Sequence, residues 1–158
     1  MSTTAVVELA PMTEALFEAW RARIIPEYAA DNVRSGDWTT EESLERSAAQ
    51  FDELLPDGRN SAGQHLWSVR DAAGEDVGIL WIATDRRPGH AFIYDIEMAE
   101  QRRGEGFGTA ALLALEDWCR ANGISSIGLH VFGHNQGAWR LYKRVGYVET
   151  NVQMEKRL

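Results

Sequence analysis

Three glycines alternate with other residues in the segment 101–118 (QRRGEGFGTAALLALEDW), directly after two arginines and directly before a helical pattern. Glycine has no Cβ, so its backbone can approach a ligand closely and adopt turns that other residues resist. The N–H groups at the start of a helix converge on one point, where the helix dipole adds roughly half a positive charge. Arg102 and Arg103 strengthen this positive field. A purely structural turn would need one glycine, so the segment predicts a loop that binds a diphosphate.

Two nucleotide-binding loops have similar patterns, and the sequence excludes both. The second and third glycines with Ala111 match the Gly-x-Gly-x-x-Ala pattern of a dinucleotide site, which also needs an acidic residue about 20 positions further on to hold a ribose. The strand expected in that region ends in Phe-Gly-His-Asn at 132–135, without an acid. A triphosphate loop needs Gly-Lys-Ser or Gly-Lys-Thr, and this loop contains no lysine. The diphosphate ligand that remains is coenzyme A.

Hydrophobic patterns typical of strands and helices alternate along the chain, without repeats or low-complexity linkers. Strands are expected at 4–10, 65–71, 76–85, 90–100, 125–133 and 147–158, and helices at 13–33 with an interruption near Pro26, 39–55, 109–122 and 136–145. Thr39 stands three residues before Glu42, which predicts a capping box at the start of the second helix. This order predicts an α/β fold, a mixed sheet with one βαβ crossover in its second half. The length of 158 residues predicts one domain.

Charge and cysteine content narrow the classes of function. The net charge is −8, and the segment 27–57 holds nine acids against two bases, so the chain lacks the basic stripe of a nucleic-acid-binding protein. No apolar run approaches the roughly 18 residues that span a membrane, and the N-terminal residues lack a signal-peptide pattern. The only cysteine, Cys119, excludes an internal disulfide and fits a reducing compartment. We therefore expect a cytoplasmic protein that binds neither nucleic acid nor a membrane.

The loop and the helix two elements further on resemble the GNAT superfamily of acyl-CoA-dependent N-acyltransferases. The stretch 103–108 (RGEGFG), followed by Thr109, is similar to the family's pyrophosphate loop, Arg/Gln-x-x-Gly-x-Gly/Ala. Downstream, 129–147 (LHVFGHNQGAWRLYKRVGY) resembles the family's Asn-x-x-Ala-x-x-Leu-Tyr-x-x-x-Gly-Tyr/Phe segment. The specific resemblance covers about residues 91–154, and the first 60 residues match only in general layout.

This resemblance implies an N-acetyltransferase that moves an acetyl group from acetyl-CoA to a primary amine by direct attack in a ternary complex. The implied fold is GNAT-like over residues 1–158, with a central, mostly antiparallel sheet and helices on both of its faces. Residues 1–60 would supply a strand and the helices on the acceptor side. Residues 61–158 would supply the sheet and the core that binds acetyl-CoA. A homodimer is compatible with the family.

The resemblance also implies roles for individual residues. Backbone N–H groups near Met98 would support the acetyl carbonyl, and Asn135 with Ala138 on the following helix would hold the pantetheine arm. Tyr142 would donate a proton to the departing sulfur, which the ordinary phenol pKa of about 10 suits. The pyrophosphate would contact the backbone of Arg103, Gly104, Glu105, Gly106, Phe107, Gly108 and Thr109.

The base that accepts the amine proton has two candidates in one strand. Asp95 and Glu97 are two residues apart and so point to the same face. Acids within an apolar strand are costly unless they are paired or functional. We prefer Glu97 because it stands closer to the acyl site; Asp95, a water chain, or a purely structural role for either acid remain alternatives. The family often carries an acid where this chain has Tyr94.

The acidic segment 27–57 precedes the strands, where the family forms one wall of the acceptor site. Tyr28 and Trp38 lie among these acids, and an aromatic face beside carboxylates favours a cationic amine, either a small molecule or a peptide. Trp38 as a core anchor is the alternative. His130 and His134 lack a metal-ligand pattern, so no metal site is expected. Two other functions remain open, namely a non-catalytic acyl-CoA sensor and an interaction module.

Overall fold

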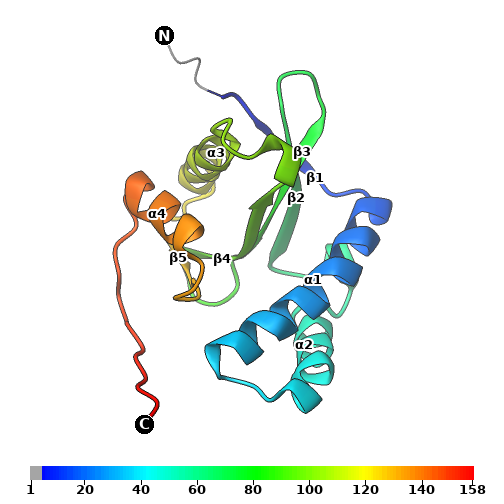
Figure 1. Ribbon diagram of the computed structural model, residues 1–158. Helices are drawn as coiled ribbons and strands as arrows, with labels where there is room; N and C mark the ends of the chain where they lie inside the picture. Colours follow the sequence, from blue (N-terminus) through cyan, green and yellow to red (C-terminus); the bar gives the residue numbers. More distant parts are fainter. Residues whose placement is uncertain (1–4) are drawn as a thin grey trace.

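The computed structural model describes residues 5–158, which form a five-stranded sheet with helices on both faces (Figure 1). The strand order is β1-β2-β3-β4-β5, and neighbours are antiparallel except for the parallel pair of β4 and β5. The strands are β1 (Glu8–Pro11), β2 (Gln64–Arg70), β3 (Asp76–Ala83), β4 (His90–Met98) and β5 (Ser126–Leu129). The helices are α1 (Glu14–Ser35), α2 (Thr40–Leu54), α3 (Phe107–Ala121) and α4 (Gln136–Val145). The mixed α/β architecture predicted from the sequence is confirmed.

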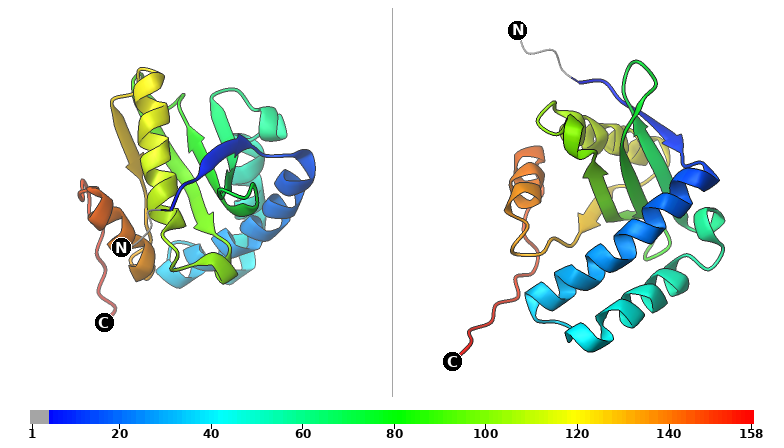
Figure 2. Two further views of the ribbon diagram at one scale, coloured as in Figure 1. Left: turned by 90° about the horizontal axis from the view of Figure 1, so that it is seen from above. Right: turned by 45° about the vertical axis from the view of Figure 1, so that its right-hand side comes forward.

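One face of the sheet is covered by α1 and α2, which lie side by side in Figure 2. The core on this face is aromatic and is centred on the buried side chain of Trp20 in α1. The ring of Trp20 lies 5.5 Å from that of Trp81 in β3 and 6.0 Å from that of Phe51 in α2. Edge-to-face aromatic pairs of this kind add to the hydrophobic gain of burial. The packing therefore fixes α1 and α2 against the half of the sheet that holds β3 and β4.

The opposite face is covered by α3, which buries Ala111, Leu112 and Leu115 against the aliphatic side chains of β2, β3 and β4. Helix α4 lies beside α3, and the two approach closely at Gly108. A Cβ at this glycine would lie 3.1 Å from Cδ2 of Leu141, so the missing side chain makes room for α4. The sheet is thus enclosed between an aromatic core on the α1–α2 face and, on the α3 face, a mainly aliphatic core that also contains Trp67, Phe107 and Tyr142.

Two expectations about local structure are wrong. Helix α1 continues through Pro26, because this residue lies on the exposed side of the helix while Ile25 and Ala29 are buried around it. The carbonyl oxygen of Ile25 also accepts a hydrogen bond from Ser47 Oγ at 2.7 Å, which ties α1 to α2 at this point. The strand expected at 147–158 is not formed. After α4 this segment runs outside the sheet and pairs with none of its five strands.

Several predicted boundaries are close to those observed. Helix α4 coincides with the predicted range 136–145 and ends at Gly146, which has φ 108°. The capping box of α2 is present, with Thr39 N–H donating to Glu42 Oε1 at 3.2 Å. The first strand begins later than expected, and Thr4 lies outside the described residues. Within residues 5–158, no helix combines the length and apolar character that crossing a membrane requires.

Candidate active site

Strands β4 and β5 separate before β4 ends. Their pairing runs from His90 opposite Ser126 to Ile93 opposite Leu129. There β5 stops, while β4 continues to Met98. The last five residues of β4, 94–98, therefore have no strand on that side, and their backbone is open to hydrogen bonding by another molecule. Such an edge suits an extended ligand with amide groups, because it can pair with them as a strand would.

A β-bulge in β4 decides which side chains face each layer. Trp81 lies opposite Asp95 and Ile82 opposite Ile93, so Tyr94 is an extra residue in the ladder. A bulge of this kind reverses the alternation of side chains beyond it. Ile93 and Ile96 consequently both pack toward the aliphatic core around α3. The acids at 95 and 97 turn to the other face, toward α1.

A continuous cavity of about 1450 Å³ follows the open edge of β4. One end lies at the loop before α3, and the other lies between α1, α2 and the aromatic side chains of the sheet. The predicted residues that line it are Tyr28, Asp95, Glu97, Met98, Arg103, Gly104, Gly106, Phe107, Gly108, Thr109, Asn135, Ala138 and Tyr142. Within residues 5–158, the lining does not include Glu105 or Trp38. The fold thus joins the predicted cofactor loop and the predicted acceptor side in one space.

The glycine loop has the backbone conformation that an anion cradle needs. Gly104 and Gly106 have φ angles of 81° and 86°, in the left-handed region that favours glycine. Gly106 is the N-cap of α3, so the N–H groups of residues 107–109 have no acceptor within the helix. These donors line the end of the cavity, at the positive end of the helix dipole. The residues present therefore fit the diphosphate of coenzyme A.

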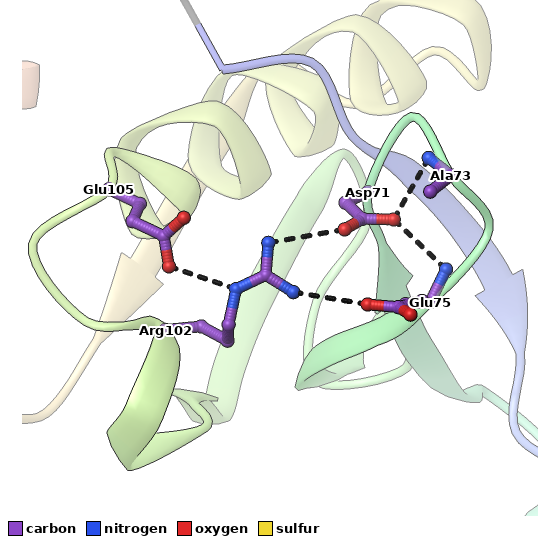
Figure 3. A network of polar contacts seen from close by, with 5 residues as sticks. All are labelled: Asp71, Ala73, Glu75, Arg102 and Glu105. Carbon is purple, nitrogen blue, oxygen red and sulfur yellow. Dashed lines mark hydrogen bonds and ion pairs between the residues drawn. The ribbon is translucent and has the colours of Figure 1, made fainter.

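The sequence predicted that Arg102 strengthens the positive field of the glycine loop, but its charge is paired with acids. Its guanidinium contacts three carboxylates, at 2.9 Å from Glu105, 3.2 Å from Asp71 and 3.4 Å from Glu75 (Figure 3). The N–H of Glu75 and the guanidinium of Arg102 lower the pKa of the Asp71 carboxyl. Arg102 is therefore mainly a clamp that ties the glycine loop to the turn between β2 and β3. Its positive charge is largely balanced by the three acids.

Two other arginines of the site lie on α4 and were missed. Arg140 and Arg144 line the cavity, and Nη2 of Arg144 lies 3.5 Å from Thr109 Oγ1 in the loop. Nε of Arg103 donates to the carbonyl oxygen of Met98 at 3.4 Å. The sequence could have indicated them, because the spacing of 137, 140, 141 and 144 places these residues on one side of a helix. The positive field at the loop thus comes from Arg103 and from α4.

Tyr142 lies on the inner side of α4, and only 9% of its surface is exposed. Burial, and then the nearby negative charge of Asp95, raise the pKa of its hydroxyl to about 12. A phenol with this pKa keeps its proton at neutral pH, but it is a weaker acid than the ordinary phenol that the sequence-based expectation assumed. Since a thiolate leaving a thioester gains negative charge, a buried phenol beside it can donate that proton.

The two acids of β4 have different surroundings. Asp95 Oδ2 accepts a hydrogen bond from Trp20 Nε1 at 2.9 Å, and burial together with the charge of Glu97 raises the pKa of Asp95 to about 7. Glu97 instead forms an ion pair with Arg23 of α1, which also contacts Glu27 at 3.1 Å. The structural alternative for Glu97, an ion pair, is therefore present, and Asp95 is the acid whose pKa is shifted toward neutrality.

The far end of the cavity combines acids and aromatic rings. The acids that line it from α1 and α2 are Glu27, Asp31 and Glu53, and the rings are those of Tyr28, Phe51, Trp81, Phe92, Tyr94 and Phe132. Asp31 Oδ1 lies 2.9 Å from His134 Nε2, which links α1 to the loop before α4. Tyr94, which stands where the family often has an acid, stacks on Trp81 with 4.5 Å between ring centroids.

Trp38 and Asn135 occupy structural positions. Trp38 is buried, its ring lies 5.4 Å from that of Tyr28, and it is not among the described residues that line the cavity. Oδ1 of Asn135 accepts from the N–H of Ala138 at 3.3 Å and caps α4. The cap fixes the start of the helix that carries Tyr142. Among residues 5–158, no three His, Cys, Asp or Glu side chains gather as a metal site would require.

Comparison with known proteins shows the family of the chain. The model of the acetyltransferase (GNAT) family matches residues 23–147. The chain belongs to the GNAT acetyltransferase family. YdgE of Bacillus subtilis strain 168, named an uncharacterized N-acetyltransferase, is 38% identical over 154 residues, which are 95% of this chain and 97% of YdgE.

Solved structures agree with this assignment. The crystal structure of the acetyltransferase YycN from Bacillus subtilis has a TM-score of 0.91 and 38% identity, and the match covers 97% of this chain and 99% of YycN. AAC(6')-Iy, solved in complex with the bisubstrate analogue CoA-S-monomethyl-acetylneamine, has a TM-score of 0.57 and 16% identity, with 99% of each chain covered. It shares the fold. The protein is therefore an N-acetyltransferase, and its family generally uses acetyl-CoA.

The Arg102 clamp predicts a loss of acetyl-CoA affinity when it is removed. Arg102→Gln frees three carboxylates beside an anion-binding loop, and we expect about three- to tenfold weaker binding of acetyl-CoA. Arg120→Gln, which removes an exposed arginine paired with acids at the other end of α3, is the matched control. Calorimetric titration of the two variants measures the difference. Equal affinities of the two variants for acetyl-CoA would contradict the proposed role of Arg102 as a clamp.

Proposed function

We propose that the protein transfers an acetyl group from acetyl-CoA to a cationic primary amine, with both substrates bound at once. The observation that carries this proposal is the continuous cavity, which runs from the loop at the N-terminus of α3 to the acidic and aromatic end between α1 and α2. A ternary complex needs one cavity that binds the cofactor at one end and the acceptor at the other. Direct attack then needs no acyl-enzyme, and the only cysteine, Cys119, is buried with a raised thiol pKa.

The residues of this chain provide a seat for acetyl-CoA, which supplies the acetyl group as a thioester. Backbone N–H groups of residues 103–109 bind the pyrophosphate, assisted by the cationic side chains of Arg103 and Arg144. The open edge of β4 near Met98 pairs with the pantetheine amides and supports the acetyl carbonyl. Ala138 and the capped start of α4 form the other wall. The backbone of Glu105 keeps its predicted role in binding the pyrophosphate, and its side chain pairs with Arg102 in the clamp.

Two side chains carry out the proton transfers of the reaction. Asp95 accepts a proton from the attacking amine, because burial has brought its pKa close to neutral pH, where a general base works best. Tyr142 donates a proton to the departing sulfur. Glu97, our preferred base from the sequence, becomes a positioning residue that joins α1 to β4 through Arg23 and raises the pKa of Asp95 by its charge. Water can extend the reach of Asp95 to the amine.

The acceptor end favours a positive charge. Glu27, Asp31 and Glu53 line it from α1 and α2, and Arg86 is the cation that lines it from the sheet side. The ring of Tyr28 is beside these acids, and a cation near an aromatic face gains additional attraction. We therefore propose a polyamine, an aminoglycoside-like amine or a lysine-like amine as acceptor, with Tyr28 in contact and Trp38 behind it as support.

Thiol release from acetyl-CoA, measured with a panel of cationic, neutral and acidic amines, tests this function. We expect turnover that is greatest with cationic amines and whose preference for them weakens as salt rises. Binding of acetyl-CoA without turnover would favour a sensor, and the absence of binding would favour an interaction module. Either result would contradict the proposal.

Removal of the Tyr142 hydroxyl should slow the chemical step. Tyr142→Phe keeps the ring that packs against Tyr147, so the fold should persist. We expect kcat to fall by roughly 10²- to 10⁴-fold, the usual contribution of a general acid, with little change in acetyl-CoA affinity. Steady-state kinetics and calorimetry separate the two quantities. Unchanged turnover would assign Tyr142 to packing alone.

The pKa of Asp95 predicts the pH dependence. This carboxyl holds its proton up to about pH 7, so kcat/KM should rise as pH increases through that value. Asp95→Asn should lower the rate and remove this limb of the profile. The folded state also holds a proton that the unfolded chain releases near pH 4, so Asp95 should make the free energy of unfolding decrease between about pH 4 and 7. A limb at pH 7 that survives in the variant would contradict the assignment.

The acidic end predicts an effect on acceptor affinity. Glu53→Gln removes a carboxylate that lines the cavity, whereas Glu45→Gln removes an exposed one on the same helix that does not line it. We expect the first change to raise KM for a cationic amine by about three- to tenfold and to leave KM for acetyl-CoA unchanged. The second should alter neither. Equal effects of the two substitutions would show that only the overall charge matters.

A further inference from the structure

The turn between β3 and β4 brings a guanidinium group to the acceptor end of the cavity. Arg86 lies in this turn and lines the cavity. Its Cζ is 3.8 Å from the centroid of the Phe92 ring and 5.9 Å from that of the Tyr94 ring. An arginine held over an aromatic ring can still direct the N–H groups at its edge to an anion. The turn therefore presents a positioned cationic donor to the acceptor.

Arg86 has no acid of its own to pair with. Within residues 5–158, no carboxylate forms an ion pair with its guanidinium, whereas Arg102 at the other end of the cavity pairs with three. The adjacent acid, Asp85, packs against Gly63, and its Oδ1 accepts a hydrogen bond from Gln64 Nε2 at 3.4 Å. The charge of Arg86 is therefore available to an anionic group of a ligand, although the chain as a whole has a net charge of −8.

This arginine and the proposed base lie along the same face of β4. Phe92, on which Arg86 stacks, and Asp95 are three positions apart, which corresponds to about 10 Å of strand. The bulge at Tyr94 places both side chains on the α1 face. The ring of Tyr94 lies between them, 5.0 Å from that of Phe92. A ligand that spans this distance along β4 can reach Asp95 with one end and Arg86 with the other.

We propose that Arg86 binds a carboxylate of the acceptor, so that the acceptor is a diamino acid with a free carboxylate rather than a polyamine. This inference rests on the proposed function, whose acceptor class it narrows. The side-chain amine of the diamino acid lies toward Asp95, and its carboxylate pairs with Arg86. Its α-ammonium lies among the acids of α1 and α2. Such a molecule keeps a net positive charge, as the acidic end of the cavity favours.

The charges at this end favour a carboxylate over a phosphate and over a second amine. A guanidinium can donate two parallel hydrogen bonds to a carboxylate, which adds orientation to the attraction. Asp31 and Glu53 line the same end, and they repel a doubly charged phosphate more strongly than a singly charged carboxylate. A polyamine would instead bring an ammonium group toward Arg86, where like charges repel. Arg86 therefore discriminates between amines that carry a carboxylate and those that do not.

Acetylation of lysine and of cadaverine, which differs from lysine only by the absence of the carboxylate, tests this discrimination. We expect kcat/KM to be about tenfold higher for lysine, and Arg86→Gln should remove this advantage without lowering kcat/KM for cadaverine. Arg87→Gln is the matched control, because Arg87 lies in the same turn, 3.2 Å from His90 Nδ1, and within residues 5–158 is not part of the cavity lining. It should alter neither value. Equal kcat/KM for the two amines in the wild type, or equal losses in Arg86→Gln, would overturn the inference and leave the proposed function intact.

Calorimetric titration of lysine into the protein saturated with CoA tests the same contact without turnover. Arg86→Gln should weaken lysine binding by about tenfold, and Arg86→Lys should restore part of it, because lysine keeps the charge but lacks the planar pair of donors. An unchanged affinity of both variants for acetyl-CoA shows that they fold. Lysine that does not bind to the wild type, or that binds equally to Arg86→Gln, would overturn the inference. The absence of acetylation with every amine would contradict the proposed function, and the inference with it.

Discussion

The separation of β4 from β5 after the Ile93–Leu129 pair is the constraint on which the rest of the site depends. It leaves the last five residues of β4 without a neighbour strand on the β5 side, and it opens the cavity between the sheet and α4. Because α3 starts at the same end of the cavity, its free N–H groups face the space that the open strand lines. A sheet paired along its full length would bury this edge and leave no room for a pantetheine arm.

The β-bulge at Tyr94 determines where the proposed base, Asp95, lies relative to this opening. It turns Asp95 toward α1, where Trp20 donates to its carboxylate and the surrounding protein raises its pKa. A partly buried carboxylate is costly unless it is hydrogen-bonded, and the indole N–H supplies part of that compensation. The same aromatic core that holds α1 to the sheet therefore positions the proposed base. Stability and catalysis share these contacts, so Trp20 serves both.

Local patterns made much of the fold predictable. The glycine loop, the ends of α4 and the capping box of α2 depend on residues close in sequence, so their signals are readable without a structure. The bulge is different, because it arises from pairing with β3 and reverses the faces of residues beyond it. The pairing of Glu97 with Arg23 and the clamp around Arg102 likewise join segments far apart in the chain. The strand predicted at 147–158 is not formed, because an alternation of apolar and polar residues does not by itself determine whether a segment pairs with the sheet.

A crystal structure of the full chain with acetyl-CoA tests the central claim most directly, namely that the divergence of β4 and β5 creates the cofactor seat. The account predicts the pyrophosphate oxygens within hydrogen-bonding distance of backbone N–H groups in 103–109. It also predicts the pantetheine amides paired with the open edge of β4 and the sulfur beside the Tyr142 hydroxyl. Acetyl-CoA bound away from this edge, or with its sulfur directed away from Tyr142 and Asp95, would contradict the account.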